Sequence, residues 1–405
     1  MQPILQAPTG SILDLVARAW AAEQPAVFAV RPTVRVGSAT LIPVAIDNGN
    51  DALKGATLRL DPALEDGESA RSRLTTVRIP TAFAPAQLIQ GRQEVTYSCD
   101  GVTFWTGETA LAHAGDALRL GPTIQRLDDE RQCWFIGAGI VELLRAAGYA
   151  PGEHQIALTL AVPNTEIVIE RDEKGVEQLT LDSRTREALT RYLKGKLWTI
   201  TRTDDDRQPE TWVIKVGTVL PQAQTTGSIV AITRAPNGRA VFDVEGMRVI
   251  DIGGGDLHVC EVRFNPAQMI NRRPGDGTIR IARALRNDRA FAGAIRNDVE
   301  AQQALVRQTI TRASRKVSIA TEVQQVVASK GNAMVADVLS ELRDSTQFVA
   351  ITGGGVLLLN GLLTNVLVHE DKQAGREYLL VDGPLASQLN VIGALFGLMF
   401  RAAGK

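Results

Sequence analysis

The chain has 405 residues, of which 44% are hydrophobic and 22% are charged. This composition is that of an ordinary soluble globular protein, and the length predicts two core-forming domains rather than one. The formal net charge of −1 excludes a general attraction to nucleic acid or to an anionic membrane, so any contact with DNA requires a local patch or an adaptor protein, and direct nucleic-acid binding is not expected.

Three cysteines, Cys99, Cys133 and Cys260, are odd in number and show no paired spacing. They argue against a disulfide framework or a zinc site and favour a reducing environment. We see no signal peptide and no apolar run that we expect to span a bilayer. The sequence therefore predicts a cytoplasmic protein.

Residues 1–39 stand outside the pattern that organises the rest of the chain. Ser11 can cap a helix that runs to Trp20. Its apolar residues fall on one face: Ile12, Leu15, Val16 and Ala19. This stripe either packs back onto the protein itself or serves as a docking element, and the residues alone leave both open.

The first notable turn follows the strand that enters Asp47. The segment LIPVAIDNGNDALKGATLRL (Leu41 to Leu60) reads as a strand, a turn of Asn48, Gly49 and Asn50, and a second strand. Glycine lets consecutive N–H groups approach one anion, and a carboxylate at a strand end can hold a divalent cation through water. The alternative is a hairpin turn that binds no ligand.

Further strands and helices follow up to Ala223. A fully apolar strand at 156–164 is typical of the buried centre of a sheet. Residues 62–72 are predicted as a charged loop. The other expected strands are 52–60, 74–80, 95–108, 197–202 and 211–219, and the expected helices are 128–147 and 182–194.

A second acid-tipped hairpin lies in Arg248 to Val262. Its first strand ends at Asp251, three glycines follow (Gly253, Gly254 and Gly255), and an alternating strand leaves after Asp256. A Pro/Gly turn at 271–278 leads into a helix at 279–286, and helical spacing resumes at 299–310 and 335–342. Arginines are frequent here, and they form either a solvated face or a contact with another subunit or a DNA adaptor: Arg272, Arg273, Arg280, Arg283, Arg286, Arg289 and Arg296.

A third glycine turn occurs in FVAITGGGVLLLNGLL, where a buried strand enters Gly353, Gly354 and Gly355 and a helix follows. The chain then closes with an apolar helix at 385–400. Two acid-tipped hairpins followed by one strand–glycine–helix turn resemble the ATPase superfamily of actin, sugar kinases and heat-shock chaperones. The chain is most similar to bacterial and archaeal actin-like proteins of the plasmid-segregating ParM kind. The similarity covers roughly residues 40–400 and is carried by IDNGN, LTLAVPNTE, VLPQAQ, VIDIGGGDL, ITGGG and LNVIGALFG.

The resemblance implies an α/β chain with an actin-like fold, in which two similar ribonuclease-H-like domains flank a nucleotide cleft. It implies an N-terminal extension (1–39), domain I (40–224), domain II (225–385) and a C-terminal helix (386–405) near the cleft. The family carries a Glu or Gln at the join of the two halves, where it orients the water that attacks the γ-phosphate. Gln222 occupies that place, and because a Gln is a weak base it implies slow hydrolysis; the alternative is a turn residue after a strand.

The same resemblance implies ATP or GTP and Mg²⁺ as ligands, with Asp47 and Asp251 organising the metal and water. The other residues expected at the nucleotide are Asn48, Gly49, Asn50, Gly253, Gly254, Gly255, Asp256, Gly353, Gly354 and Gly355. The implied function is nucleotide-dependent filament assembly followed by hydrolysis, in plasmid segregation or in organising the cytoplasm. The implied partners are further copies of the chain, with a DNA-binding adaptor as a candidate.

Two positions depart from the family pattern. The second phosphate loop usually carries a Thr and then an Asp where this chain has Asp256 and His258. An added carboxylate repels a triphosphate unless it faces away or binds the metal, which leaves metal coordination and the hydrolysis rate open. Two other functions therefore remain: a nucleotide-binding scaffold that does not polymerise, and a small-molecule kinase, which needs a catalytic Asp that the sequence does not place convincingly.

Overall fold

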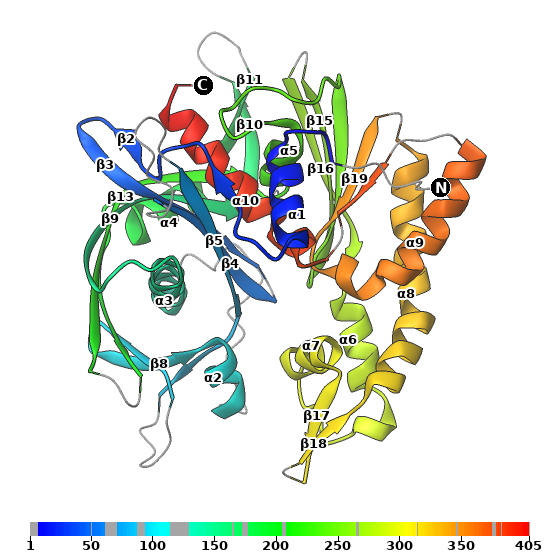
Figure 1. Cartoon of the computed structure of the whole chain (residues 1–405). Coiled ribbons are helices and arrows are strands. Elements are labelled where there is room, and N and C mark those ends of the chain that lie inside the picture. Colours follow the sequence, from blue (N-terminus) through cyan, green and yellow to red (C-terminus); the bar gives the residue numbers. More distant parts are fainter. Residues whose placement is uncertain are drawn as a thin grey trace. The chain divides into compact units, whose positions relative to one another are not determined.

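The computed structural model describes residues 7–49, 51–60, 71–86, 94–113, 129–163, 166–171, 177–204, 208–264, 267–313, 315–345, 347–374, 378–381 and 383–404 (Figure 1). The chain divides into two compact units. Unit 1 comprises Met1–Thr9 and Phe242–Leu389, and unit 2 comprises Gly10–Val241 and Asn390–Lys405. Helix α10 (Gly383–Ala402) begins in unit 1 and continues in unit 2.

The sheet of unit 2 is built around five strands. They lie in the order β5 (Ser72–Pro80), β4 (Ala52–Leu60), β3 (Ala39–Asn48), β9 (Gly152–Val162) and β13 (Glu210–Ala223). The first three strands pair antiparallel, whereas β3, β9 and β13 pair in parallel. Every residue of β9 from Ile156 to Val162 is buried, as expected for an apolar strand at the centre of a parallel arrangement.

Shorter strands extend this sheet at its edges. Beyond β13 lie β12 (Leu197–Thr203), β7 (Thr96–Cys99), β8 (Val102–Thr106) and β6 (Phe83–Pro85), while β1 (Val27–Phe28) pairs with β5 and β2 (Val34–Val36) pairs with β3. A separate hairpin is formed by β10 (Ile167–Arg171) and β11 (Glu177–Leu181). Two short helices, α2 (Gly107–His113) and α4 (Ser183–Tyr192), also belong to unit 2.

Helix α3 (Glu130–Ala146) packs closely on one face of this sheet, and the helix predicted at 128–147 is thus present. A Cβ atom at Gly137 would lie 2.8 Å from the side chain of Ile200, and one at Gly139 would lie 2.8 Å from Leu53. These two glycines therefore let the helix backbone approach β12 and β4 more closely than any larger residue allows.

Helix α1 (Ile12–Ala21) packs against α5 (Thr226–Thr233) within unit 2. Ser11 caps it, because its hydroxyl oxygen accepts a hydrogen bond from the N–H of Asp14 at 3.0 Å. Ile12 and Val16 are fully buried, and the N–H of Ile12 donates to the carbonyl of Arg234 at 2.9 Å. The apolar stripe of residues 1–39 is therefore packing for the protein's own body.

Unit 1 repeats the central arrangement of unit 2. Its sheet has the order β16 (Ala267–Asp276), β15 (Asp256–Phe264), β14 (Gly246–Ile252), β19 (Phe348–Thr352) and β20 (Tyr378–Leu380). The pairs β16–β15 and β15–β14 are antiparallel, and β14–β19 and β19–β20 are parallel. Two antiparallel pairs followed by two parallel pairs thus occur in both units, which confirms the predicted α/β class with two similar domains.

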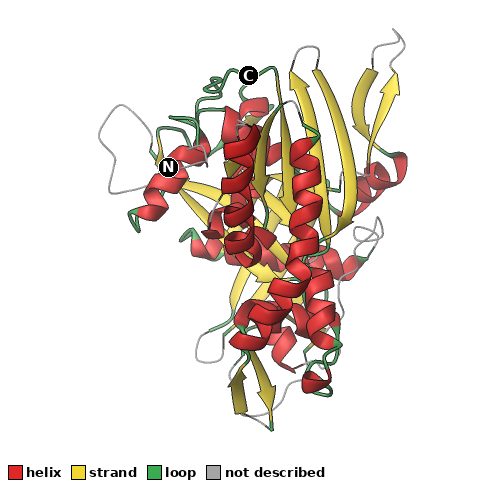
Figure 2. Cartoon of the chain, turned by 90° about the vertical axis from the view of Figure 1, so that its right-hand side faces the viewer, coloured by secondary structure: helices red, strands yellow, loops and turns green. Residues whose placement is uncertain are grey.

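The helices of unit 1 are α6 (Ile279–Arg286), α7 (Asp298–Arg307), α8 (Ala320–Arg343) and α9 (Gly355–Ala374), together with the short 3-10 helix η4 (Arg289–Phe291). Figure 2 shows the long helices of this unit in front of its strands. A small hairpin, β17 (Thr309–Arg312) with β18 (Arg315–Ser318), extends beyond the helices at the lower end of both views.

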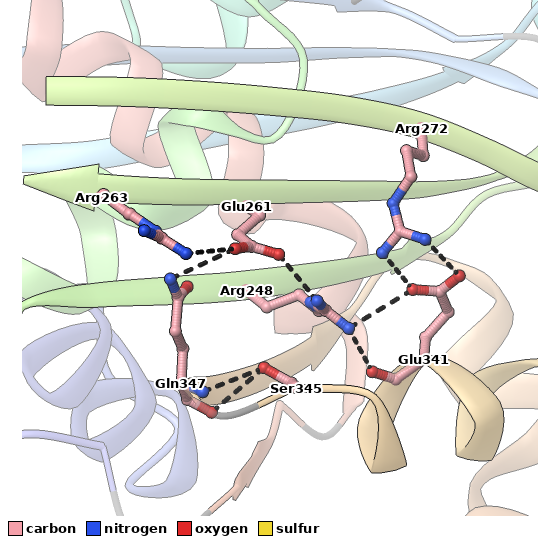
Figure 3. Close-up of polar contacts among 7 residues, drawn as sticks. All are labelled: Arg248, Glu261, Arg263, Arg272, Glu341, Ser345 and Gln347. Atoms are coloured by element: carbon pink, nitrogen blue, oxygen red, sulfur yellow. Dashed lines mark hydrogen bonds and ion pairs between the residues drawn. The ribbon is translucent and has the colours of Figure 1, made fainter.

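A buried ion network fastens α8 to the strands of unit 1 (Figure 3). Arg248 of β14 contacts Glu261 at 2.7 Å and donates to the backbone carbonyl of Glu341 at 2.6 Å. Arg272 of β16 contacts the Glu341 carboxylate at 2.6 Å. The cations thus meet the last turn of α8, where a helix carries partial negative charge.

Several predicted boundaries differ from the structure. Strand β13 continues through Pro221, so Gln222 lies inside the strand and not after it. Residues 271–276, predicted as a turn, belong to β16, where Pro274 is tolerated because β16 is an edge strand. The helix expected at 299–310 ends at Arg307, and the strand expected at 95–108 is the β7–β8 hairpin with the start of α2. The predicted loop at 62–72, except for its last two residues, lies outside the described residues.

Among the described helices, α10 alone is long and apolar enough to cross a membrane, by length and composition. This differs from the expectation that no apolar run reaches that length. Most of the helix is buried inside the protein, as in the core helix of a soluble protein.

Candidate functional site

Asp47 and Gln222 lie at the carboxyl ends of two parallel strands of unit 2. Ala161 of β9 is the register partner of Asp47 on β3 and also of Gln222 on β13. Register partners on neighbouring strands point to the same face, so the two polar side chains flank Ala161 on one face, with backbones about 10 Å apart. Both are largely buried, each with 5% of its surface exposed. The carboxyl ends of parallel strands are where α/β sheets bind ligands.

Helix α10 covers this face. The side-chain amide of Asn390 donates a hydrogen bond to Oδ2 of Asp47 at 3.2 Å. About two helical turns further along the same face, a Cβ atom at Gly397 would lie 3.2 Å from Oε1 of Gln222, so the helix backbone passes directly over this residue. A Cβ atom at Gly393 would overlap the carbonyl of Gly227 in α5, at 1.7 Å. Glycines therefore set the height of α10 above the two polar residues.

Lys54 is the register partner of Asp47 across the β3–β4 hairpin. Its ammonium lies 3.9 Å from Oδ2 of Asp47, and its side chain is 13% exposed. A Cβ atom at Gly49 would lie 3.7 Å from the same ammonium. The glycine turn that was predicted to hold phosphate thus has a cation beside it, opposite the carboxylate.

The turn between β3 and β4 is held by neighbouring residues. Thr81 donates from its N–H to the carbonyl of Asp51 at 3.0 Å and from its hydroxyl to the carbonyl of Gly49 at 2.8 Å. Burial raises the pKa of the Asp51 carboxyl group, but Lys54 and Arg78 lower that pKa by more, so it lies below its ordinary value. Asp51 is therefore ionised and ties the turn to Arg78, at 3.0 Å.

Asn48 points to the opposite face of the sheet, because successive strand residues alternate. Its amide nitrogen donates to Oε1 of Gln132 in α3 at 2.9 Å. The backbone of Asn48 remains part of the turn, but its side chain is directed toward α3 and away from the face that carries Asp47. Asn50, the last predicted residue of this turn, lies outside the described residues.

The oxygens near Asp47 suit a hard cation such as Mg²⁺. Oδ1 of Asp47 and Oδ1 of Asn390 are both buried, and within the described residues neither has a hydrogen-bond partner. Mg²⁺ is commonly held through one or two carboxylates, waters and substrate phosphates rather than by an all-protein cage. The described part of the chain accordingly contains no group of three or more His, Cys, Asp or Glu side chains that could hold a metal ion by itself.

In unit 1, Asp251 is the next-to-last residue of β14 and lies opposite His258 and in register with Thr352 of β19. The three carbonyls of the glycine loop point toward the start of α6. Gly253 accepts from the N–H of Thr278 at 3.0 Å, Gly254 accepts from the N–H of Ile279 at 2.7 Å, and Gly255 accepts from that of Gly277 at 2.9 Å.

This pattern fixes the direction of two amides. In a trans peptide unit the N–H points opposite to the C=O of the preceding residue. The N–H groups of Gly254 and Gly255 are therefore directed away from α6, on the side opposite to the carbonyls of Gly253 and Gly254. Two consecutive amides on one side of a turn form the concave donor arrangement that binds anions.

The glycine turn after β19 packs onto the end of β14. Gly353 has a φ of +99°, and a Cβ atom there would lie 2.2 Å from Oδ1 of Asp251. A Cβ atom at Gly355 would lie 2.4 Å from the side chain of Ile252. The left-handed backbone and the lack of space require glycine at 353, and the lack of space alone requires it at 355. The predicted residues Asp251 and Gly353 are thus neighbours.

The unusual carboxylate of Asp256 has a positively charged partner within the protein. Arg273 of β16 forms an ion pair with it, and Nε2 of His258 lies 3.6 Å from its Oδ2. The extra negative charge in the second loop therefore has a guanidinium partner, which reduces its repulsion toward an anion.

Sequence reasoning missed two residues of this site, Lys54 and Asn390. Lys54 could have been predicted from the sequence. It and Asp47 are equally far from the centre of the hairpin turn, which makes them cross-strand partners. Asn390 is a polar residue inside the apolar LNVIGALFG segment, and that exception to the pattern was its only local signal.

No family sequence model matches the chain, and no curated protein sequence matches it. The structure, however, is similar to a crystal structure of an archaeal actin homologue, Ta0583, with a TM-score of 0.59 and 17% identity over 87% of this chain and 98% of the other. The chain has an actin-like fold.

Other solved structures support the same fold. This actin-like chain is similar to Bacillus thuringiensis ParM solved with ATP, with a TM-score of 0.59 and 12% identity over 90% of this chain and 99% of that one. It is also similar to the subunit of a 15-stranded ParM filament from Clostridium botulinum, with a TM-score of 0.58 and 14% identity over 88% and 98% of the two chains. Each of these similarities covers most of the chain and therefore includes residues of both units.

Proposed function

We propose that this actin-like chain is a nucleoside triphosphatase that binds ATP or GTP with Mg²⁺ and assembles into filaments while the nucleotide is bound. The observation that carries the proposal is the alignment of Asp47 and Gln222 on either side of Ala161, at the carboxyl ends of parallel strands. The similarity to a ParM solved with ATP and to a ParM filament supports it. A role in plasmid segregation or in organising the cytoplasm, with a DNA-binding adaptor, is the corresponding biological proposal.

The residues of unit 2 would act on the phosphates and on water. Asp47, with Oδ2 held by Asn390 and Lys54, would present Oδ1 to a metal-bound water. Lys54 would contact a phosphate oxygen beside the Gly49 turn. Gln222 would orient the attacking water through its amide, and because an amide is a weak base, hydrolysis would be slow.

The residues of unit 1 would provide the second phosphate loop. The N–H groups of Gly254 and Gly255 would donate to phosphate oxygens. Asp251 would orient water at the metal, and Gly353 to Gly355 would allow the adenosine part to pass close to the backbone. Bound Mg²⁺ would supply charge neutralisation on the phosphate oxygens.

A nucleotide-binding scaffold without turnover is the second candidate. It is favoured by the position of Gln222, which is 5% exposed and lies under the backbone of Gly397. If this packing holds the side chain away from water, nucleotide would bind and phosphate would not be released.

One experiment separates these functions. Right-angle light scattering of the full chain is followed after addition of ATP or GTP with Mg²⁺, with inorganic phosphate measured in the same samples. The proposed function predicts scattering that needs both nucleotide and Mg²⁺ and phosphate release that follows it. If nucleotide binds without a rise in scattering and without phosphate release, the scaffold function is supported. If nucleotide does not bind, both candidate functions are overturned.

A further inference from the structure

The hairpin β17–β18 at the end of unit 1 carries a concentration of positive charge that the nucleotide site does not use. Arg312, Arg315 and Lys316 are all exposed. The sequence from Val306 to Ile319 contains no Asp or Glu. This hairpin is a local basic element in a chain whose net charge is −1.

Its cations differ from the arginines of the neighbouring helices. Arg280 pairs with Asp337 at 3.1 Å, and Arg283 and Arg286 pair with Asp298 at 2.9 and 2.5 Å. Those arginines form ion pairs on the helix surface and are neutralised. By contrast, no carboxylate of the described residues lies within ion-pair distance of the three hairpin cations. Arg312 instead donates to the backbone carbonyl of Ala290 at 3.5 Å.

The arrangement of these cations is unfavourable for the hairpin alone. Arg312 and Arg315 are direct cross-strand partners. Like charges placed directly opposite each other destabilise a strand pair. Because no carboxylate of the described residues compensates them, we take an external anion as the partner that makes this arrangement favourable.

The cations also lie on both faces of the ribbon. Arg312 and Arg315 share one face, whereas Lys316 lies opposite Thr311 on the other. A flat anionic surface, such as a membrane, reaches only one face of such a ribbon. The hairpin also lacks the exposed aromatic or leucine side chains that membrane-binding surfaces insert, since Ile310 is buried and Val317 is 40% exposed.

A duplex with a groove between two phosphate backbones can meet both faces at once. The major groove of B-form DNA is about 12 Å wide and admits a two-stranded β-ribbon, whereas the major groove of A-form RNA is too narrow for protein side chains to read. Thr311 adds a hydroxyl of the kind that donates to phosphate oxygens. We propose that the hairpin Thr309–Ser318 binds duplex DNA, with Arg312, Arg315 and Lys316 contacting phosphates on the two sides of the major groove.

This inference goes beyond the proposed nucleotide-dependent function and does not depend on it. It also changes the expectation, drawn from the net charge, that the chain does not bind nucleic acid directly. A local basic patch is sufficient for contacts with the phosphate backbone of DNA. Three phosphate contacts give binding that is independent of sequence and depends on salt, with a slope of log K against log salt of about −2.7.

The test uses the full chain without nucleotide and a fluorescein-labelled 20-base-pair DNA duplex, followed by fluorescence anisotropy at several salt concentrations. We expect a Kd of roughly 10⁻⁴ to 10⁻⁶ M, as for non-specific binding. The variant Arg312→Gln/Arg315→Gln/Lys316→Gln should weaken binding by at least ~10-fold and flatten the salt slope. The matched control Arg31→Gln/Arg35→Gln/Lys330→Gln removes the same charge from exposed residues elsewhere and should bind like the parent.

A single variant separates charge from folding. Arg312→Glu places opposite charges across the hairpin, so the thermal midpoint should be unchanged or higher while DNA binding is lost. Equal loss in the control variant, equal binding by the hairpin variant, or a preference for vesicles of anionic lipid over the duplex would each overturn the proposal.

Discussion

Asn390 of α10 donates a hydrogen bond to Oδ2 of Asp47 at 3.2 Å, although 343 residues separate the two in sequence. The contact joins the last helix of the chain to the end of β3, and it leaves Oδ1 of Asp47 turned elsewhere. Asn390 is therefore a positioning residue for the carboxylate that we propose to act at the metal.

Replacing Asn390 by Ala should weaken Mg²⁺-dependent nucleotide binding by about 1.5–3 kcal/mol, as expected when a hydrogen bond to a charged group is lost. Titration calorimetry with and without Mg²⁺ measures this effect. Gln132→Ala is the matched control, since it removes the hydrogen bond to Asn48 on the opposite face and should leave the Mg²⁺ dependence unchanged. Identical behaviour of the two variants would show that Asn390 is only a packing residue.

Lys54 should contribute to nucleotide affinity through its charge. Lys54→Met keeps the apolar stem and removes the ammonium, so affinity for ATP or GTP should fall by about 1.5–3 kcal/mol. Arg78→Met is the control, because Arg78 is the cross-strand neighbour of Lys54 and its charge is engaged by Asp51. If both variants lose nucleotide affinity equally, the loss comes from the reduced positive charge of the protein and not from a contact between Lys54 and the nucleotide.

Gln222 should separate hydrolysis from assembly. Gln222→Ala removes the amide that would position water, so phosphate release should slow by roughly 10²-fold or more while binding and light scattering persist. Gln224→Ala is the natural comparison, since this nearby residue is half-buried and outside β13. Parent-like phosphate release by Gln222→Ala, with loss in Gln224→Ala, would move the role to Gln224.

The local motifs of the site could be predicted from the sequence because their conformation depends on residues that are neighbours in the chain. Asp47 and Asp251 are each the next-to-last residue of an apolar strand that leads into glycines, and a glycine turn needs only its own residues to be recognised. The pairing of Asn390 with Asp47 could not be predicted, because it depends on how a distant helix packs. Pro274 was read as a turn residue, although the edge position of β16, a tertiary property, allows it in a strand. The β17–β18 hairpin was missed because four-residue strands without an Asn-Gly turn carry little pattern.

The thiols of Cys99 and Cys133 should be unreactive in the folded protein. Burial raises the pKa of each thiol to about 12. At pH 8 the thiolate fraction is then on the order of one in ten thousand, and the thiolate is the reactive form. Iodoacetamide should modify neither residue in the native chain and both in urea, as read by peptide mass spectrometry. Ser329→Cys, on the exposed surface of α8, should react under native conditions, and rapid native modification of Cys133 would contradict its burial.

The network around Glu341 should contribute strongly to the stability of unit 1. Glu341 contacts Arg272 and Arg248, and the side chain of Arg248 is only 7% exposed. Glu341→Gln removes a counter-charge from a buried guanidinium, which costs about 3–5 kcal/mol when no other partner exists. Because Arg248 keeps Glu261 at 2.7 Å and Arg272 is partly solvated, we expect a loss near the lower limit, ~3 kcal/mol.

Urea unfolding followed by circular dichroism measures this loss as a lower midpoint for the transition of unit 1. Glu300→Gln is the control, because Glu300 in the first turn of α7 pairs with the exposed Arg296, which precedes that helix, and such surface pairs contribute at most about 1 kcal/mol. The two variants remove the same charge from the same unit, so a general electrostatic effect would lower both midpoints equally. If only Glu341→Gln lowers the midpoint, the cause is the burial of Arg248, whose guanidinium then needs the negative charge of Glu341.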